Sequence, residues 1–104
     1  MTADRSPVFR KDLLRGRVAL VTGGNRGIGE AFVRVLLESG AQKVYAGSRD
    51  PAAAAHLVAQ YPGRCIALEL DVTDYDEVAK AARECSDVSL VVNNAGLFSN
   101  QTLL

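Results

Sequence analysis

The residues best suited to chemistry form a glycine-rich run between an apolar segment at 17–21 and a helical pattern. The run is Thr22-Gly23-Gly24-Asn25-Arg26-Gly27-Ile28-Gly29. Gly23 permits a tight turn, and the small residues Gly27 and Gly29 let the backbone approach a ligand and the helix pack on a sheet. Free N–H groups and the positive end of the helix dipole favour a pyrophosphate there. The run therefore predicts a nucleotide-binding loop, the alternative being an ordinary glycine-rich turn.

The segment about 20 residues beyond these glycines indicates which dinucleotide would bind. An NAD site places Asp or Glu there to bond the ribose 2′-hydroxyl. This chain has Gly47-Ser48-Arg49, with no acid before Asp50. Ser48 can donate to a phosphate, and the planar guanidinium of Arg49 can clamp one. We therefore expect NADP rather than NAD, the alternative being that Arg49 is a solvated surface charge.

These candidate residues must be positioned by an alternation of short strands and helices. Continuously apolar runs at 17–21, 43–47, 65–70 and 88–92 predict strands, and helical patterns lie between them. Such strands are typical of a parallel sheet covered on both faces. The sequence thus predicts an α/β fold with a three-layer, doubly wound parallel sheet, ending after its fourth strand.

Residue spacing also predicts where the helices begin, end and face the core. In the first helix the expected core face is Ile28, Phe32, Val35 or Leu36, and Ser39, with Gly40 as C-cap. Asp50 and Pro51 predict the start of the second helix. Thr73 and Asp76 resemble a capping box for the third, whose expected core face is Val78, Ala82 and Cys85.

Three motifs occur in order along the chain: TGGNRGIG at 22–29, Asp71-Val72-Thr73 after the third strand, and Asn93-Asn94-Ala95-Gly96 after the fourth. With these three motifs in this order, the sequence closely resembles the short-chain dehydrogenase/reductase family from about Gly16 to Phe98. The resemblance implies a Rossmann fold, NADP as cofactor, and hydride transfer between NADP(H) and a carbonyl or alcohol substrate. The G-x-x-x-G-x-G spacing and the Asn-Asn-Ala-Gly motif argue against a flavin- or NAD-binding protein of another Rossmann type.

The resemblance also implies a role for each matching position. The loop from Gly23 to Gly29 would hold the pyrophosphate, and Arg26 matches the basic position of NADP-preferring members. Asp71 and Val72 would border the adenine, with the Asp71 carboxylate accepting from its amino group; a helix N-terminal acid is the alternative. The motif at 93–96 would line the adenosine ribose, or else form only a turn. The complete expected cofactor site is Gly23, Asn25, Arg26, Gly27, Ile28, Gly29, Ser48, Arg49, Asp71, Val72, Asn93, Asn94, Ala95 and Gly96.

No residue of the chain matches the family's catalytic Ser and Tyr-x-x-x-Lys. The tyrosines at 45, 61 and 75 are followed four residues later by Arg49, Cys65 and Ala79. His56 has no partner in the sequence pattern, and a structural role is expected for it. We therefore expect residues 1–15 to be a polar lead and residues 16–104 to be a partial NADP-binding domain, without turnover on its own. The apolar fourth strand would then be an open edge, available for self-association.

Composition narrows the classes of function and location that the sequence allows. The 12 basic and 12 acidic residues balance, which argues against a nucleic-acid partner. Apolar runs are too short to cross a bilayer, and no signal peptide or metal-ligand cluster is evident. Cys65 and Cys85 are expected to be buried thiols of a soluble cytoplasmic protein. A second hypothesis is a non-catalytic module that binds a nucleotide or docks a partner on the fourth strand.

Overall fold

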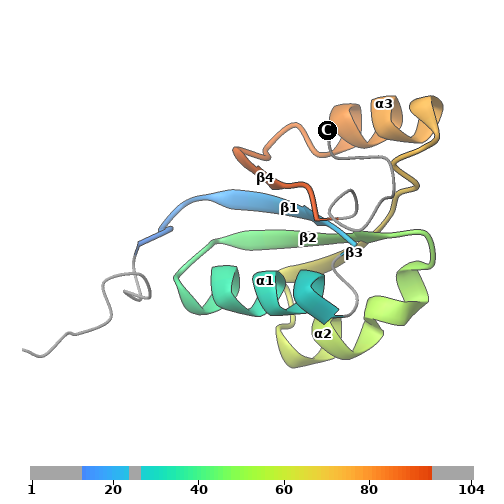
Figure 1. Cartoon of the computed structure of the whole chain (residues 1–104). Coiled ribbons are helices and arrows are strands. Elements are labelled where there is room, and N and C mark those ends of the chain that lie inside the picture. Colours follow the sequence, from blue (N-terminus) through green and yellow to red (C-terminus); the bar gives the residue numbers. More distant parts are fainter. Residues whose placement is uncertain (1–12, 24–26, 95–104) are drawn as a thin grey trace, which may run out of the picture.

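The computed structural model describes residues 13–23 and 27–94, which alternate strands and helices (Figure 1). Helix η2 is a short 3-10 helix that leads directly into α2. In chain order the elements are β1 (Val18–Thr22), α1 (Gly27–Glu38), β2 (Lys43–Ser48), η2 (Pro51–Ala54), α2 (Ala55–Gln60), β3 (Cys65–Glu69), α3 (Tyr75–Glu84) and β4 (Leu90–Val92).

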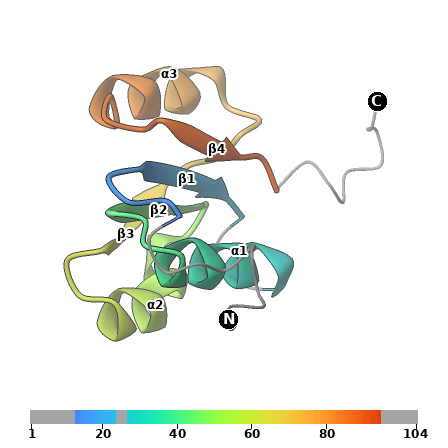
Figure 2. The ribbon, with the colours of Figure 1, turned by 90° about the vertical axis from the view of Figure 1, so that its left-hand side faces the viewer.

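The four strands form one parallel sheet in the order β3-β2-β1-β4. Helices α1 and α2 cover one face, and α3 lies on the other, as the view in Figure 2 shows. The predicted three-layer, doubly wound α/β fold is therefore confirmed. In this arrangement the carboxyl ends of all four strands point to one edge of the sheet, where ligands bind in open α/β folds.

The main hydrophobic core lies between the sheet and the pair α1 and α2. Its largest fully buried side chains are Leu37, Leu57, Val21, Val33 and Val44. A smaller cluster on the other face gathers Val18, Tyr45 and Cys85. Alternate residues of β1 and β2 serve the two clusters, as the two-residue period of a strand requires.

The core face of α1 differs from the expected one. Its centre is Gly29, Val33 and Leu37, whereas Ile28 is 49% exposed and Val35 37% exposed. Phe32 and Leu36 only flank the core, and Ser39 is buried. The helix is turned toward Gly29 because that residue, lacking a Cβ, allows the closest approach to the chain leaving β1.

Two of the expected helix ends are confirmed and one is wrong. Gly40 ends α1 with φ 96°, and the Asp50 carboxylate accepts from Ala52 N at 3.1 Å ahead of Pro51. The N-cap of α3 is Asp74, whose carboxylate accepts from Asp76 N at 3.0 Å and from Glu77 N at 3.3 Å. Thr73 instead bonds to Asp71.

Helix α3 and strand β4 also depart from the expected pattern. Ala81 and Cys85 are buried, while Val78 is 40% exposed and Ala82 is exposed. Strand β4 begins at Leu90 rather than at Val88, because Val88 N donates to Cys85 O in the turn that follows α3. None of the helices in the described part of the chain is long and apolar enough to cross a membrane.

Candidate functional site

The turn that links β1 to α1 is built on two glycines with left-handed backbone conformations. Gly23 has φ 68° and Gly27 has φ 60°, which side-chain-bearing residues rarely adopt. Gly23 N donates to Gly47 O at 2.8 Å, so the turn is tied to the end of β2. Asn25 and Arg26, also expected in this loop, lie outside the described residues.

Gly29 is the point where α1 approaches the rest of the site most closely. A Cβ added there would collide with the carbonyl oxygen of Gly23 and would lie 2.7 Å from Asn94 Nδ2. Only a glycine therefore fits between the first turn of α1, the turn after β1 and the segment after β4. This close packing holds the N-terminus of α1, where the first N–H groups have no partner within the helix, at the carboxyl edge of the sheet.

The two asparagines after β4 are both bonded across the sheet to the end of β1. Asn93 Oδ1 accepts from Thr22 Oγ1 at 3.1 Å, and Asn94 Nδ2 donates to Gly23 O at 3.4 Å. Asn94 is 5% exposed, and its Oδ1 has no hydrogen-bond partner among the described residues. A buried acceptor without a partner is costly, which marks Oδ1 as a position for a ligand donor. Ala95 and Gly96 lie outside the described residues.

Thr22 is a site residue to which the sequence analysis gave no role. Its side chain is buried, and its hydroxyl bonds to Asn93, 71 positions later in the sequence. A hydroxyl directly before the glycine turn was visible in the sequence. Its partner was not, because the pairing depends on β1 and β4 being neighbours in the sheet.

At the end of β2, Ser48 and Arg49 have different surroundings. Ser48 is 7% exposed, and its hydroxyl donates to Asp50 O at 2.9 Å, inside the turn. Since a hydroxyl has one proton to donate, Ser48 already uses it there. The Arg49 side chain is exposed. Arg49 is thus the group at this position that can contact an anion without first breaking a bond.

At the end of β3, the carboxylate of Asp71 is held by Thr73. Asp71 Oδ1 accepts from Thr73 Oγ1 at 2.6 Å and from Thr73 N at 2.9 Å. These bonds lower the pKa of Asp71, and the positive charge of Arg49 lowers that pKa further. Asp71 and Arg49 are therefore close enough to interact, as expected for residues that follow adjacent strands. Two apolar side chains at this edge, Val72 and Ile28, are 42% and 49% exposed.

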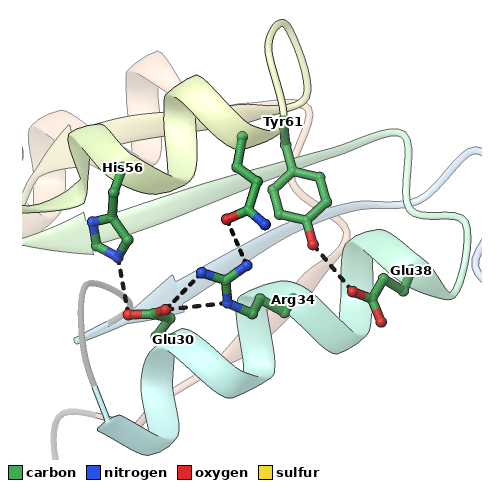
Figure 3. A network of polar contacts seen from close by, with 6 residues as sticks. Glu30, Arg34, Glu38, His56 and Tyr61 are labelled. Atoms are coloured by element: carbon green, nitrogen blue, oxygen red, sulfur yellow. Dashed lines mark hydrogen bonds and ion pairs between the residues drawn. The ribbon is translucent and has the colours of Figure 1, made fainter.

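A network of polar contacts joins α1 to α2 beside the site (Figure 3). Glu30 lies between Arg34 Nη2 at 2.8 Å and His56 Nε2 at 3.0 Å, and these hydrogen bonds, that of His56 first, lower the pKa of Glu30. Arg34 also donates to Gln60 Oε1 at 2.7 Å. His56, for which a structural role was expected, thus has a hydrogen-bond partner on another helix. The network supports the position of α1, whose first turn contains Glu30.

The described residues at the carboxyl edge of the sheet combine several groups that suit an anionic ligand. The carboxyl edge offers Gly23 and Gly27, which lack side chains, a helix N-terminus, the exposed guanidinium of Arg49 and the ionised carboxylate of Asp71. Asn94 Oδ1, which is buried and has no partner within 13–23 and 27–94, also fits a ligand with a donor group. Among these same residues there is no His, Cys, Asp and Glu cluster able to hold a metal ion.

Comparison with known proteins shows the family of this chain. Residues 17–104 match the short chain dehydrogenase family, and the chain belongs to that family. It is 35% identical over 96 residues to the 3-oxoacyl-(acyl-carrier-protein) reductase FabG of Vibrio harveyi, covering 88% of this chain and 38% of the reductase. It is 39% identical over 106 residues to the sex determination protein tasselseed-2 of Zea mays, covering 97% of this chain and 31% of that protein.

Two solved structures with NADP are also similar. A short chain dehydrogenase from Burkholderia cenocepacia in complex with NADP is 42% identical with a TM-score of 0.72, over 81% of this chain and 34% of that one. The Pseudomonas aeruginosa RhlG/NADP active-site complex is 40% identical with a TM-score of 0.69, over 86% and 37%. The chain thus spans about a third of the length of these relatives.

Proposed function

We propose that this chain is the NADP(H)-binding portion of an oxidoreductase that transfers hydride between NADP(H) and a carbonyl or alcohol substrate. The observation that carries the proposal is the end of β2, where an exposed Arg49 occupies the region in which an NAD site would place an acid. The two similar structures that contain NADP support it. The nicotinamide of the bound cofactor would supply or accept the hydride.

Each part of the site has a role in this proposal. The Gly23–Gly29 turn and the N-terminus of α1 bind the pyrophosphate through backbone N–H groups. Arg49 pairs with the 2′-phosphate, and Ser48 contributes by closing the turn that precedes η2. Asp71 and Val72 border the adenine. Asn94 presents its buried Oδ1 to a ribose hydroxyl, while Asn93 ties β4 to β1 through Thr22.

The cofactor preference is tested with Arg49→Ala, titrated with NADPH and NADH by calorimetry. Loss of a hydrogen-bonded ion pair to the phosphate should weaken NADPH binding by about 1.5–3 kcal/mol, which is tenfold or more, and leave NADH binding nearly unchanged. Arg83→Ala removes another exposed guanidinium, in the last turn of α3, and serves as the matched control. An equal loss of affinity for NADPH and NADH would show that Arg49 does not bind the 2′-phosphate.

We also propose a cytoplasmic location. Cys65 and Cys85 are both free and buried, which suits a reducing compartment.

As a second function, we propose association through β4. Val91 in β4 is 58% exposed, an apolar side chain on a strand that pairs only with β1 in the described part of the chain. Light scattering across a concentration series tests this: Val91→Lys should abolish any dimer, and a chain that is monomeric at all concentrations would contradict the association.

A further inference from the structure

The loop after β3 fixes the main chain of Asp71 from both sides. Asp71 N donates to Glu77 Oε1 at 2.8 Å, and Asp71 O accepts from Asp74 N at 2.9 Å. Both partners belong to the start of α3, with Asp74 as its N-cap. The main chain of Asp71 is therefore held by the helix that follows it. The direction of the Asp71 carboxylate then depends on the rotamer of its side chain.

Thr73 fixes the rotamer of the Asp71 side chain. Its hydroxyl and its N–H group both donate to the same carboxylate oxygen, Oδ1, at 2.6 and 2.9 Å. With Oδ1 engaged twice, Oδ2 is the oxygen left for a ligand. These bonds also lower the pKa of Asp71, so the carboxylate is ionised at neutral pH and acts only as an acceptor.

We propose that Thr73 is a positioning residue that makes Asp71 selective for the base of the cofactor, a purine with an amino group at C6. The inference rests on the proposed function, in which Asp71 borders the adenine. A fixed acceptor binds a base more tightly when the base has a hydrogen-bond donor at that point, and binds it more weakly when the base has an acceptor there. Adenine carries an amino group there, whereas hypoxanthine carries a carbonyl oxygen, which would face the carboxylate acceptor to acceptor.

The test compares NADPH with its hypoxanthine analogue, measured as dissociation constants by calorimetry with the full 104-residue chain. The unmodified chain should bind NADPH about tenfold more tightly than the analogue, near the lower end for a hydrogen bond to a charged group. Thr73→Val keeps the shape and removes the hydroxyl, and should reduce the preference to about threefold or less, because the Thr73 N–H group alone then holds Oδ1 and orients the carboxylate less firmly. Thr73→Ser should restore it.

Controls separate this role from a general effect on folding or binding. Thr73 is exposed, so its variants should unfold at nearly the same temperature as the unmodified chain. Ser86→Ala removes another exposed hydroxyl, in the turn after α3, and should leave the preference intact. A full preference in Thr73→Val would refute the role of Thr73. Equal binding of both compounds by the unmodified chain would refute base selection alone, whereas no binding of NADPH would refute the proposed function itself.

Discussion

Local and tertiary structure predict opposite effects of Gly29→Ala on the stability of the folded chain. Gly29 lies in the first turn of α1, and within a helix alanine is more stable than glycine by about 1 kcal/mol. The tertiary structure opposes this gain. The new Cβ would collide with Gly23 O, a backbone atom, and crowd Asn94 Nδ2 at 2.7 Å. Overpacking of a filled site typically costs about 1–3 kcal/mol, and backbone must move here, so the upper part of that range applies.

We therefore expect Gly29→Ala to lower the free energy of unfolding by about 2 kcal/mol, the packing cost less the gain in helix propensity. For a domain of this size that corresponds to a fall in Tm of roughly 8–16 °C. NADPH affinity should fall with it, because the turn that carries the pyrophosphate N–H groups must shift. Urea denaturation with a fitted slope, followed by NADPH titration, measures both effects.

Gly63→Ala is the matched control for this experiment. Gly63 has φ 78° and open space around its Cβ position, far along the chain from the site. Alanine there should cost about 1–2 kcal/mol through backbone strain alone and leave NADPH affinity unchanged. If Gly29→Ala were as stable as the unmodified chain or more so, helix propensity would dominate and the close contact with Gly23 would not constrain the site.

Three further predictions concern the core, the ion pairs and the thiols. Leu37→Ala, at a side chain that is 1% exposed, should cost about 2–5 kcal/mol in urea denaturation, and a cost below 1 kcal/mol would contradict the assigned core. The hydrogen bond from Lys43 lowers the pKa of Asp87 below its unfolded value near 3.8, so the stabilisation that ionised Asp87 provides is present above pH 3.8 and lost as pH falls below it. Denaturation from pH 5 to pH 2 should accordingly give a shallower acid loss for Asp87→Asn, whereas identical slopes would argue against the pair. Burial raises the pKa of Cys65 and Cys85, so a thiol reagent at neutral pH should label both only in urea, and rapid labelling of the folded chain would show that they are accessible.

The sequence by itself determined the order of the elements and the position of the glycine turn between the first strand and the first helix. Alternating apolar runs and helical patterns require only local periodicity, and they predicted the parallel sheet and its three layers. Gly23 was expected in a tight turn because few other residues tolerate such a backbone conformation, and its φ is positive. Ser48, Arg49 and Asp71 lie at one edge because they stand at or just after the ends of two adjacent parallel strands.

Tertiary structure decided which side chains meet and which donors are already engaged. Periodicity predicted an amphipathic α1 but missed the centre of its buried face, which depends on the contact between Gly29 and Gly23. His56 meets Glu30 across 26 positions, and Thr22 meets Asn93 across 71. Such partners cannot be predicted from local spacing, because they depend on which strands and helices become neighbours. For the same reason the sequence predicted Ser48 as a phosphate donor, whereas the folded turn directs its single proton to the carbonyl of Asp50.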